Sequence, residues 1–342
     1  MNAGYFKTTL LAISVVFFLN QCGGDARILV KQSTGLPGEF VVVADSRYVI
    51  APHPIMDSVK SWFERPLRAL LQPEPTFKVY KIDDAHFGSV FKYHRNILLL
   101  NIGAPPDAPV VAMQYDKWAL RQLVVQLNVP SEAEFFKIFS EKRDEIEALF
   151  RDHDILRLAE DFDKSPASEA REMVLKSTGV SISLPSGFFC ADTSEGIAFV
   201  RHVAERSISG GHKGVIERGL IIFSLKYFHP NQFSTSSFLE DIKSPLRKKV
   251  QGAKDSTWME IEPRVSCDSS AIRMGNSYGL RVKGLWRLHG EFKGGPFVAI
   301  RFYEESLKKL YTIFGYVYAP AFPKRQYLYQ VEAIARSAFR PN

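Results

Sequence analysis

The first part of the chain alternates short apolar runs with one stretch of helical spacing. Residues 38–44 (GEFVVVA) are strongly β-branched and predict a strand. Apolar side chains at helical spacing predict a helix over 53–71, which Pro66 should break or kink because its ring cannot continue a helix interior. Further strands are predicted at 77–81, 96–102, 110–114 and 123–127.

The clearest helix begins after Pro130. Ser131 and Glu134 have the spacing of a capping box, in which the serine hydroxyl takes the Glu134 amide while the glutamate side chain reaches back. The charged helical stretch should continue to about Lys176, with interruptions near 152–154 and 165–166. Helical spacing predicts its apolar face at Phe135, Phe139, Ile146 and Phe150, with Ile138 and Leu149 beside it.

The second part of the chain is richer in predicted strands. A helix is predicted over 234–250, and two strands should form a hairpin around 304–306. A closing helix over 324–339 should turn Leu328, Val331, Ala335 and Ala338 inward. The predicted strands are 181–184, 196–203, 220–227, 258–263, 278–288, 297–303 and 310–318, and in the last of these the period of two places Phe314, Tyr316 and Tyr318 on one face.

The start of the sequence has the pattern of an export signal. One positive charge, Lys7, precedes an uncharged and mostly apolar run over 8–19, which is too short to span a bilayer as a helix. Leu19 stands three residues before Cys22, the spacing of a lipoprotein signal, although Asn20 and Gln21 are atypical there. We therefore expect Cys22 to carry acyl chains such as palmitate. The alternative is a cleaved signal peptide with a cysteine nearby.

The residues after Cys22 bear on where the protein would be placed. Gly23 stands where inner-membrane retention would need an aspartate, so the outer membrane is favoured, with the periplasmic face expected. Strands and helices interleave in both halves, which predicts an α+β fold with mixed or antiparallel sheets and flanking helices. The expected divisions are a signal peptide (1–21), the lipidated cysteine with a flexible tether (22–37), an N-terminal α/β half (38–160), a helical junction (161–177) and a β-rich C-terminal half (178–342).

The positive net charge suits an anionic surface partner, but the scattered distribution of lysines and arginines argues against nucleic acid. The chain carries a formal +7, and loss of Lys7 with the signal peptide would leave +6. Such a charge suits contact with anionic lipid or a cell-wall polymer, or simply a basic surface without such a partner. Lysines and arginines are scattered, and no polybasic block resembles a nucleic-acid-binding arm.

Three cysteines allow one disulfide if Cys22 is acylated. Cys190 and Cys267 would then form an even pair in an oxidising compartment. The alternative is two buried free thiols that lie far apart, since spacing in the sequence does not fix their separation.

Motifs for catalysis and metal binding are absent from the sequence. HExxH, CxxC, GxSxG and the P-loop do not occur, and no two of the eight histidines have ligand spacing on one helix face, so we predict no metal and no cofactor. We interpret Asp152-His153-Asp154 as a solvated run of charge rather than as an acid–base or metal site. The SxxK match at 306–309 should fall in a hairpin turn, where serine and lysine would not stack as catalysis requires.

Gly294-Gly295-Pro296 is the most unusual local sequence. The glycines permit positive φ or close backbone approach before a strand. One interpretation is a ligand-facing loop in which aromatic and basic side chains suit sugars or carboxylates. The other is a turn that leads into a strand, with the aromatics packing in the sheet. The candidate ligand-binding residues are Trp286, Gly294, Gly295, Phe297, Arg301, Tyr303, Tyr318, Lys324 and Arg325.

Four stretches resemble a known family. They are LLQPEPTF (70–77), HRNILLLNIG (94–103), GLWRLHGEFKGGPFVAI (284–300) and FGYVYAPAFPKRQYLYQVEAIARS (314–337). On these the chain resembles an uncharacterised family of Bacteroidetes envelope lipoproteins, known as a domain of unknown function. The resemblance implies a lipid-modified Cys22 and an envelope location, and it implies no activity. The chain departs from the pattern at Asn20-Gln21 and at Lys248, where an acidic residue is expected.

These observations leave three hypotheses. The first, which we favour, is an outer-membrane lipoprotein that binds an envelope protein or a cell-wall component without catalysis, because every specific signal concerns placement. The second is a hydrolase-like enzyme acting on a cell-wall or saccharide substrate near Gly294-Gly295. The third is an assembly factor with a purely structural role.

Overall fold

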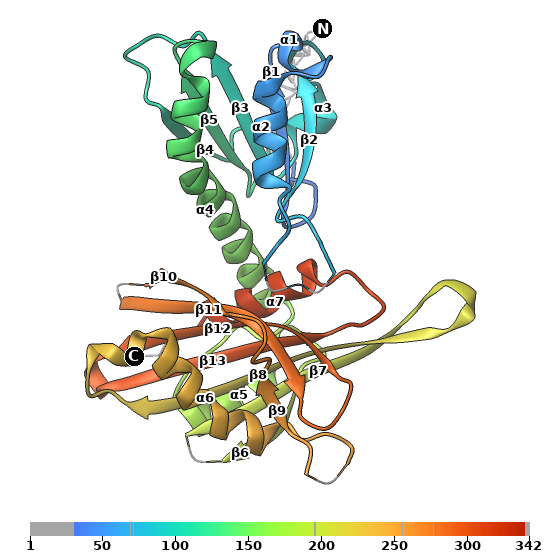
Figure 1. Cartoon of the computed structure of the whole chain (residues 1–342), viewed down its shortest axis with the longest axis vertical. Coiled ribbons are helices and arrows are strands. Elements are labelled where there is room, and N and C mark those ends of the chain that lie inside the picture. Colours follow the sequence, from blue (N-terminus) through green and yellow to red (C-terminus); the bar gives the residue numbers. More distant parts are fainter. Residues whose placement is uncertain are drawn as a thin grey trace, which may run out of the picture. The chain divides into compact units, whose positions relative to one another are not determined.

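The computed structural model describes residues 31–68, 70, 72–194, 196–254, 256–275 and 277–338. The predicted signal peptide and Cys22 lie outside these residues. The described part contains seven α-helices and thirteen strands in two sheets, which confirms the α+β class (Figure 1). No helix within it is long and apolar enough to cross a membrane.

The first sheet is mostly parallel and has the order β2-β1-β3-β5-β4. Only β4 runs antiparallel, at one edge. The strongly apolar sequences of β1 and β5 follow from burial on both faces of a parallel sheet. The elements are β1 (Glu39–Ala44), α1 (Ser46–Val49), α2 (Pro54–Phe63), β2 (Lys78–Asp83), α3 (Ser89–Lys92), β3 (Asn96–Ile102), β4 (Val111–Tyr115) and β5 (Leu123–Val129).

Two cores lie on the two faces of this sheet. On one face Phe40, Val42 and Leu98 pack against α2 and α4 (Glu132–Lys164). The predicted apolar face of α4 is confirmed, because all six of its residues belong to or pack against this core. On the other face Val41 and Ile97 pack with partly buried aromatic residues from the loops that follow β2 and β4.

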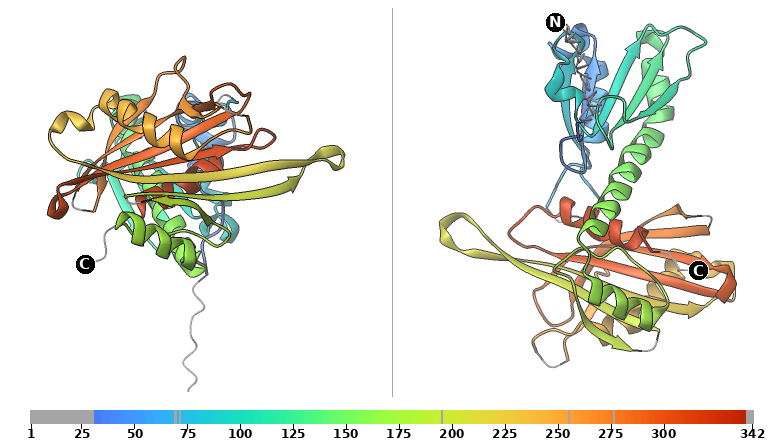
Figure 2. Two further views of the ribbon diagram at one scale, coloured as in Figure 1. Left: turned by 90° about the horizontal axis from the view of Figure 1, so that it is seen from below. Right: turned by 180° about the vertical axis from the view of Figure 1, so that it is seen from behind.

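The second sheet is antiparallel and has the order β10-β11-β12-β13-β8-β7-β6, with β9 paired to β11. Its helices cover both faces: α5 and α7 on one, α6 on the other (Figure 2, left). The elements are α5 (Ser168–Thr178), β6 (Phe189–Ser194), β7 (Ile197–Ser207), β8 (Lys213–Lys226), α6 (Thr235–Lys249), β9 (Met259–Ile261), β10 (Asp268–Met274), β11 (Ser277–Leu288), β12 (Gly294–Glu304), β13 (Lys309–Tyr318) and α7 (Arg325–Arg336).

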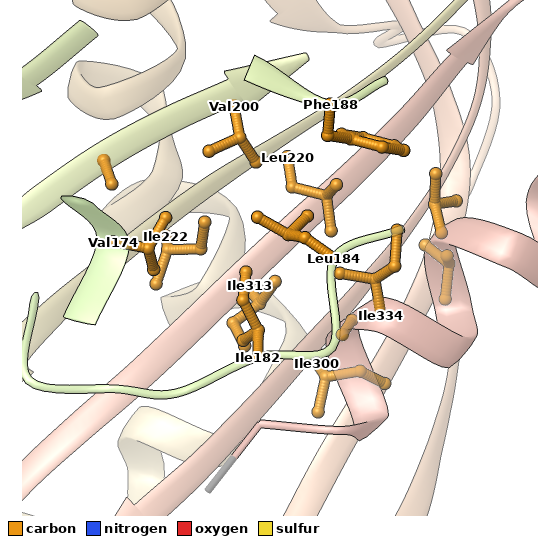
Figure 3. Packing of buried hydrophobic residues seen from close by; sticks show 14 of the residues in the cluster. Val174, Ile182, Leu184, Phe188, Val200, Leu220, Ile222, Ile300, Ile313 and Ile334 are labelled. Atoms are coloured by element: carbon orange, nitrogen blue, oxygen red, sulfur yellow. The ribbon is translucent and has the colours of Figure 1, made fainter. Parts of the chain in front are cut away.

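The core under α5 and α7 is built from alternate residues of the central strands. Val200, Leu220 and Ile313 from three neighbouring strands face Val174 of α5 and Ile334 of α7 (Figure 3). The inward residues predicted for the closing helix are confirmed, since Leu328, Val331 and Ala335 belong to this core and Ala338 packs against it. Phe314, Tyr316 and Tyr318 share the opposite face, as the period of two predicts.

Several predicted elements differ from the structure. The helix predicted over 53–71 ends at Phe63, before Pro66, which instead forms an isolated bridge with Pro75. The stretch 181–184 is not a strand, although Ile182 and Leu184 do point into the core (Figure 3). The predicted capping box is incomplete, because the Ser131 hydroxyl donates to the Glu134 carboxylate (3.1 Å) and no side-chain hydrogen bond caps the α4 amides.

The interruption predicted at 152–154 is wrong, and so is its interpretation as solvated charge. Helix α4 continues without a break to Lys164, and Asp154 is completely buried. Its carboxylate accepts the Gly38 amide (2.7 Å) and the Asn96 side-chain amide (3.1 Å), and it pairs with Arg95 (2.7 Å). These partners are over fifty residues away in sequence, so the local pattern could not indicate them.

The predicted disulfide does not form. Cys190 and Cys267 are free thiols. Cys190 lies on β6, at one edge of the antiparallel sheet, and Cys267 directly precedes β10, at the other edge. Five strands in the sheet order lie between β6 and β10, which is incompatible with the short Cα separation that a disulfide needs.

Candidate functional site

A cleft with a volume of about 940 Å³ lies where β11 ends and β12 begins. We call it the β11–β12 cleft. Its walls include the connecting turn 289–293, the segment around Arg264, and Tyr318 with Pro320 after β13. Four of the predicted ligand-binding residues line it: Trp286, Gly294, Gly295 and Tyr318.

The two glycines are required by close approach of neighbouring strands. A Cβ atom on Gly294 would lie 2.7 Å from the Trp286 carbonyl oxygen, and one on Gly295 would lie 2.1 Å from the Val317 carbonyl oxygen. Neither glycine has positive φ. Any side chain at these positions would push the backbones of β11, β12 and β13 apart, so the glycines shape the floor of the cleft.

Trp286 supports the cleft from beneath. Its side chain is buried, and the indole Nε1–H donates to the Val317 carbonyl oxygen (3.2 Å). The ring meets Tyr316 edge to face at a centroid distance of 5.2 Å. The indole therefore holds β11 against β13 and does not offer a face to a ligand.

A buried carboxylate, Glu217, organises the polar wall beside Trp286. It accepts the Tyr316 hydroxyl (2.6 Å) and pairs with Arg201 and Lys293, both at 3.1 Å. Burial and the neighbouring Glu217 raise the pKa of Tyr316 well above its usual value, so this hydroxyl stays protonated. A small cavity of about 80 Å³ lies next to this cluster.

Sequence reasoning missed the Glu217 cluster, although a signal was present. Glu217 and Arg218 interrupt the otherwise apolar strand GVIERGLIIF, and charge within such a strand indicates a buried pair or a site. The partner Lys293 lies on the turn and reaches back over Tyr318, with its ammonium 4.7 Å from the ring centroid.

Among the described residues, three carboxylates at or next to the cleft, Glu260, Glu262 and Glu291, have partners. Arg264 binds Glu262 through two side-chain hydrogen bonds (2.7 and 2.8 Å), and with the Arg264 amide it lowers the pKa of Glu262 to about 2. Glu260 pairs with Arg287 at 2.7 Å. Glu291 accepts the Lys254 amide and the Thr257 hydroxyl, which lower its pKa. Neither Glu262 nor Glu291 is therefore held as a proton donor.

Exposed aromatic and cationic groups remain on the rim. Phe292 is fully exposed at the tip of the turn. His289 stacks on Trp258 at 4.3 Å, and Arg247 lies 4.1 Å from the same indole centroid. This combination can bind a flat or anionic ligand by stacking and charge.

Comparison with known protein families assigns most of the described chain to two families. Residues 167–337, half of the 342-residue chain, match the domain of unknown function DUF4837. The chain belongs to the DUF4837 family. Residues 33–163 match a second domain of unknown function, DUF8532. The resemblance to an uncharacterised family is thus confirmed at that level. A search of curated proteins found no match.

The DUF4837 region contains the β11–β12 cleft, but it does not bring the nine predicted residues together. Phe297 is buried in the core under α6. Arg301 is fully buried as well, and it pairs with Asp241 (2.9 Å) and donates to Thr312 (3.0 Å). Its pKa is lowered by burial. These two residues stabilise the attachment of α6 to the sheet.

The other three predicted residues lie at two further places. Tyr303 lines a separate hollow of about 490 Å³, where its ring lies 4.4 Å from that of Tyr227. Lys324 and Arg325 begin α7 and contact the DUF8532 region. Both of their amides donate to the Glu74 carboxylate (2.6 and 2.9 Å), which caps the helix from the other half of the chain.

The remaining motifs contribute no reactive group. Ser306 lies in the short turn between β12 and β13, as predicted, and its hydroxyl donates to Glu304 (2.8 Å). Within the described ranges no three histidine, cysteine, aspartate or glutamate side chains are placed to hold a metal ion.

A smaller hollow of about 280 Å³ lies at the carboxyl ends of β1 and β3, where parallel sheets often bind ligands. Asp45 caps the four-residue helix α1 and pairs with Arg47 (3.0 Å). No glycine-rich loop follows β1, and Asp45 places negative charge there. The hollow therefore does not resemble a phosphate-binding site.

Proposed function

We propose that this protein is a lipid-anchored binding protein of the bacterial envelope, acylated at Cys22. In this proposal it faces the periplasm from the outer membrane, and the β11–β12 cleft holds an envelope protein or a cell-wall component without catalysis. The spacing of Leu19 and Cys22 after the apolar run supports the anchor.

One observation carries the binding role. The described carboxylates near the cleft are bound to arginines, hydroxyls or amides. Phe292 is fully exposed, and the side chains of Arg264, Arg287 and Lys293 remain accessible at the edge of the cleft. The cleft thus offers apolar and cationic contacts that are already in place. Binding needs such preorganised contacts and needs no group with a shifted protonation state.

The hydrolase alternative at Gly294-Gly295 has less support. A general acid must hold a proton near neutral pH, but Arg264 keeps Glu262 ionised. Within the described part of the chain, none of the residues that line the cleft is a serine, threonine or cysteine that could act as a nucleophile.

The anchor is tested by Cys22→Ser. We expect the variant to lose membrane association on cell fractionation, and mass spectrometry of the wild-type mature N-terminus to show acyl chains on Cys22. A wild-type N-terminus without acyl chains would remove the anchor from the proposal.

The binding role is tested by crosslinking in intact cells, followed by purification of the protein. Phe292→Ser should remove the co-purified species. Phe228→Ser is the matched control, because Phe228 is also exposed but lies outside the cleft. Equal yields of the partner from both variants would assign binding to another surface.

A further inference from the structure

A compact face of the DUF8532 region combines lysines with aromatic rings where the described chain begins. Lys31 lies with its ammonium 4.4 Å from the centroid of the Tyr93 ring. The backbone fixes this position, since the Leu120 amide donates to the Lys31 carbonyl (2.8 Å) and the Thr34 amide to the Tyr93 carbonyl (2.7 Å). Lys31, the first described residue, is therefore part of this face.

Two further lysine–aromatic pairs continue the face. Lys92 lies 5.8 Å from the Phe87 ring centroid, and Lys117 lies 4.6 Å from that of Trp118. Phe87 and Trp118 meet edge to face at 5.4 Å, so the two pairs adjoin. We call the set Lys31, Phe87, Val90, Lys92, Lys117 and Trp118 the basic-aromatic face.

Val90 adjoins these pairs in the sequence and does not belong to the neighbouring hydrophobic core. It belongs to the short helix α3, between Phe87 and Lys92, and it is 75% exposed. A large apolar side chain left in water, in the same short segment as Phe87 and Lys92, is consistent with a surface that meets a partner.

The lysines of the face are not neutralised by nearby carboxylates. Among the described residues, none lies within 4.0 Å of the ammonium of Lys31, Lys92 or Lys117. The neighbouring acids have other partners: Asp116 accepts the Arg121 amide, and Asp83 binds His86 (2.7 Å). Glu160 and Asp161 pair with Arg121. The face thus presents three uncompensated positive charges.

The covalent chain limits how far this face can lie from the proposed anchor. Lys31 is the ninth residue after Cys22. Since an extended chain spans at most about 3.5 Å per residue, a tether of this length can reach no further than about 30 Å. An acyl anchor at Cys22 would therefore keep this face close to the lipid surface.

We propose that the basic-aromatic face binds the surface of an anionic lipid bilayer. The lysine ammonium groups pair with lipid phosphates, while Trp118 and Val90 enter the interfacial layer, where aromatic and apolar side chains are stable. The limit set by chain length rests on the proposed anchor, whereas the lysine charges and exposed apolar groups would favour anionic lipid without it.

The test uses a chain that begins at residue 22 and carries Cys22→Ser, so that no acyl group contributes. This chain should fold, because all five hydrophobic cores lie within the compact unit Lys31–Asn342. Its binding is measured by sedimentation with vesicles of phosphatidylcholine containing about one third phosphatidylglycerol, and with vesicles of phosphatidylcholine alone. We expect binding to the anionic vesicles only, weakening as salt screens the charges.

The decisive variant replaces Lys31, Lys92 and Lys117 together by glutamine. It should bind the anionic vesicles on the order of 100-fold more weakly, since each lysine near an anionic surface contributes about fivefold. The matched control replaces Lys226, Lys254 and Lys309, which lie in the DUF4837 region, and should change binding by less than about twofold. Equal losses in both variants would overturn the proposal, because they would show attraction to net charge alone.

A second measurement reports on contact rather than on charge. Tryptophan fluorescence should shift to shorter wavelength on vesicle binding, and Trp118→Phe should abolish most of that shift. Val90→Asp should weaken binding without unfolding the protein, because Val90 is exposed. No binding to anionic vesicles, or binding only to a soluble polyanion such as heparin, would also overturn the proposal. These outcomes are independent of whether wild-type Cys22 is acylated.

Discussion

Two charged regions of the molecule pair the same kinds of side chain, a glutamate with basic residues, in different surroundings. At the contact of α4 and α7, Glu332 binds Arg281 and Lys283, both at 3.2 Å, and every partner is at least nine-tenths buried. At the cleft, Glu262 binds Arg264 at 2.7 Å, but the arginine side chain is 79% exposed. We call the first region the junction cluster and the second the cleft rim.

The difference shows that one kind of ion pair serves two purposes. In the junction cluster water cannot replace a lost partner, so each charge depends on the others. At the cleft rim water competes for both groups, so the pair adds little stability and instead fixes the charge state of the cleft. The junction cluster is therefore structural, whereas under the proposed function the cleft rim would determine which ligands fit.

The largest expected effect follows loss of the central carboxylate of the junction cluster. Burial alone would raise the pKa of Glu332, but Lys283, Arg281 and Arg151 outweigh it and hold it well below the usual range. Glu332→Ala leaves these cations buried without a counter-charge, so we expect the free energy of unfolding to fall by about 3–5 kcal/mol. Urea denaturation followed by circular dichroism measures it. A loss as small as that of an exposed pair would refute the assignment.

Asp154 provides a second test of the same idea. Asp154→Asn keeps the shape of the side chain but removes the charge that compensates Arg95. We expect a loss of about 3 kcal/mol, since one buried cation remains unpaired while several hydrogen bonds persist. Asp152→Asn is the neighbouring control, because the Asp152 side chain, which pairs with Arg336, is 47% exposed. Equal effects of the two changes would contradict the role of burial.

The sequence predicts the apolar framework of both regions but not their charges. Phe135, Phe139, Ile146 and Phe150 repeat at helical spacing, so the buried face of α4 can be read locally. Asp154 lies on the same helix, but charged residues in helices are usually solvated. Only its distant partners, Gly38, Asn96 and Arg95, explain its burial.

At the cleft, too, the sequence indicates the local backbone pattern but not which charged residues line the site. The unusual glycines and nearby aromatics mark the stretch 286–295, because close backbone approach leaves a local signature. Arg301 and Lys324 have the same residue types as real rim residues, yet they lie in the core and at the start of α7. Edge strands such as β6 (FCADTS) also escape prediction, because they need no apolar alternation.

A smaller effect should appear as a pH dependence of the junction cluster. The pKa of Lys283 is lowered to about 8. Burial is the largest cause, Arg281 and Arg151 add to it, and together they outweigh Glu332, which raises the pKa. In the unfolded chain lysine keeps its proton up to about pH 10.4. Between these values the unfolded state binds more protons, so stability should rise with pH through that window.

This dependence is measured by urea unfolding at pH 7, 8 and 10 in the wild type and in Lys283→Met. The methionine side chain fills similar space without a titrating group. We expect the stability of the wild type relative to the variant to increase by on the order of 2 kcal/mol across this range. A difference that stays constant with pH would show that Lys283 does not titrate there.

The smallest expected effect is at the cleft rim, and it sharpens the contrast with the junction. Glu262→Gln removes the carboxylate that Arg264 binds, but the exposed arginine regains water in exchange. In the wild type, the stability that ionised Glu262 contributes should be constant above the ordinary glutamate pKa of 4.5. It should be lost as pH falls toward about 2, where the carboxylate of the folded protein takes up its proton. At neutral pH we therefore expect the urea midpoint to change far less than in Glu332→Ala, while the released Arg264 should strengthen binding of an anionic ligand in the cleft. A large loss of stability would instead place Glu262 among the structural charges, and the proposed division between a structural junction and a ligand-facing rim would fail.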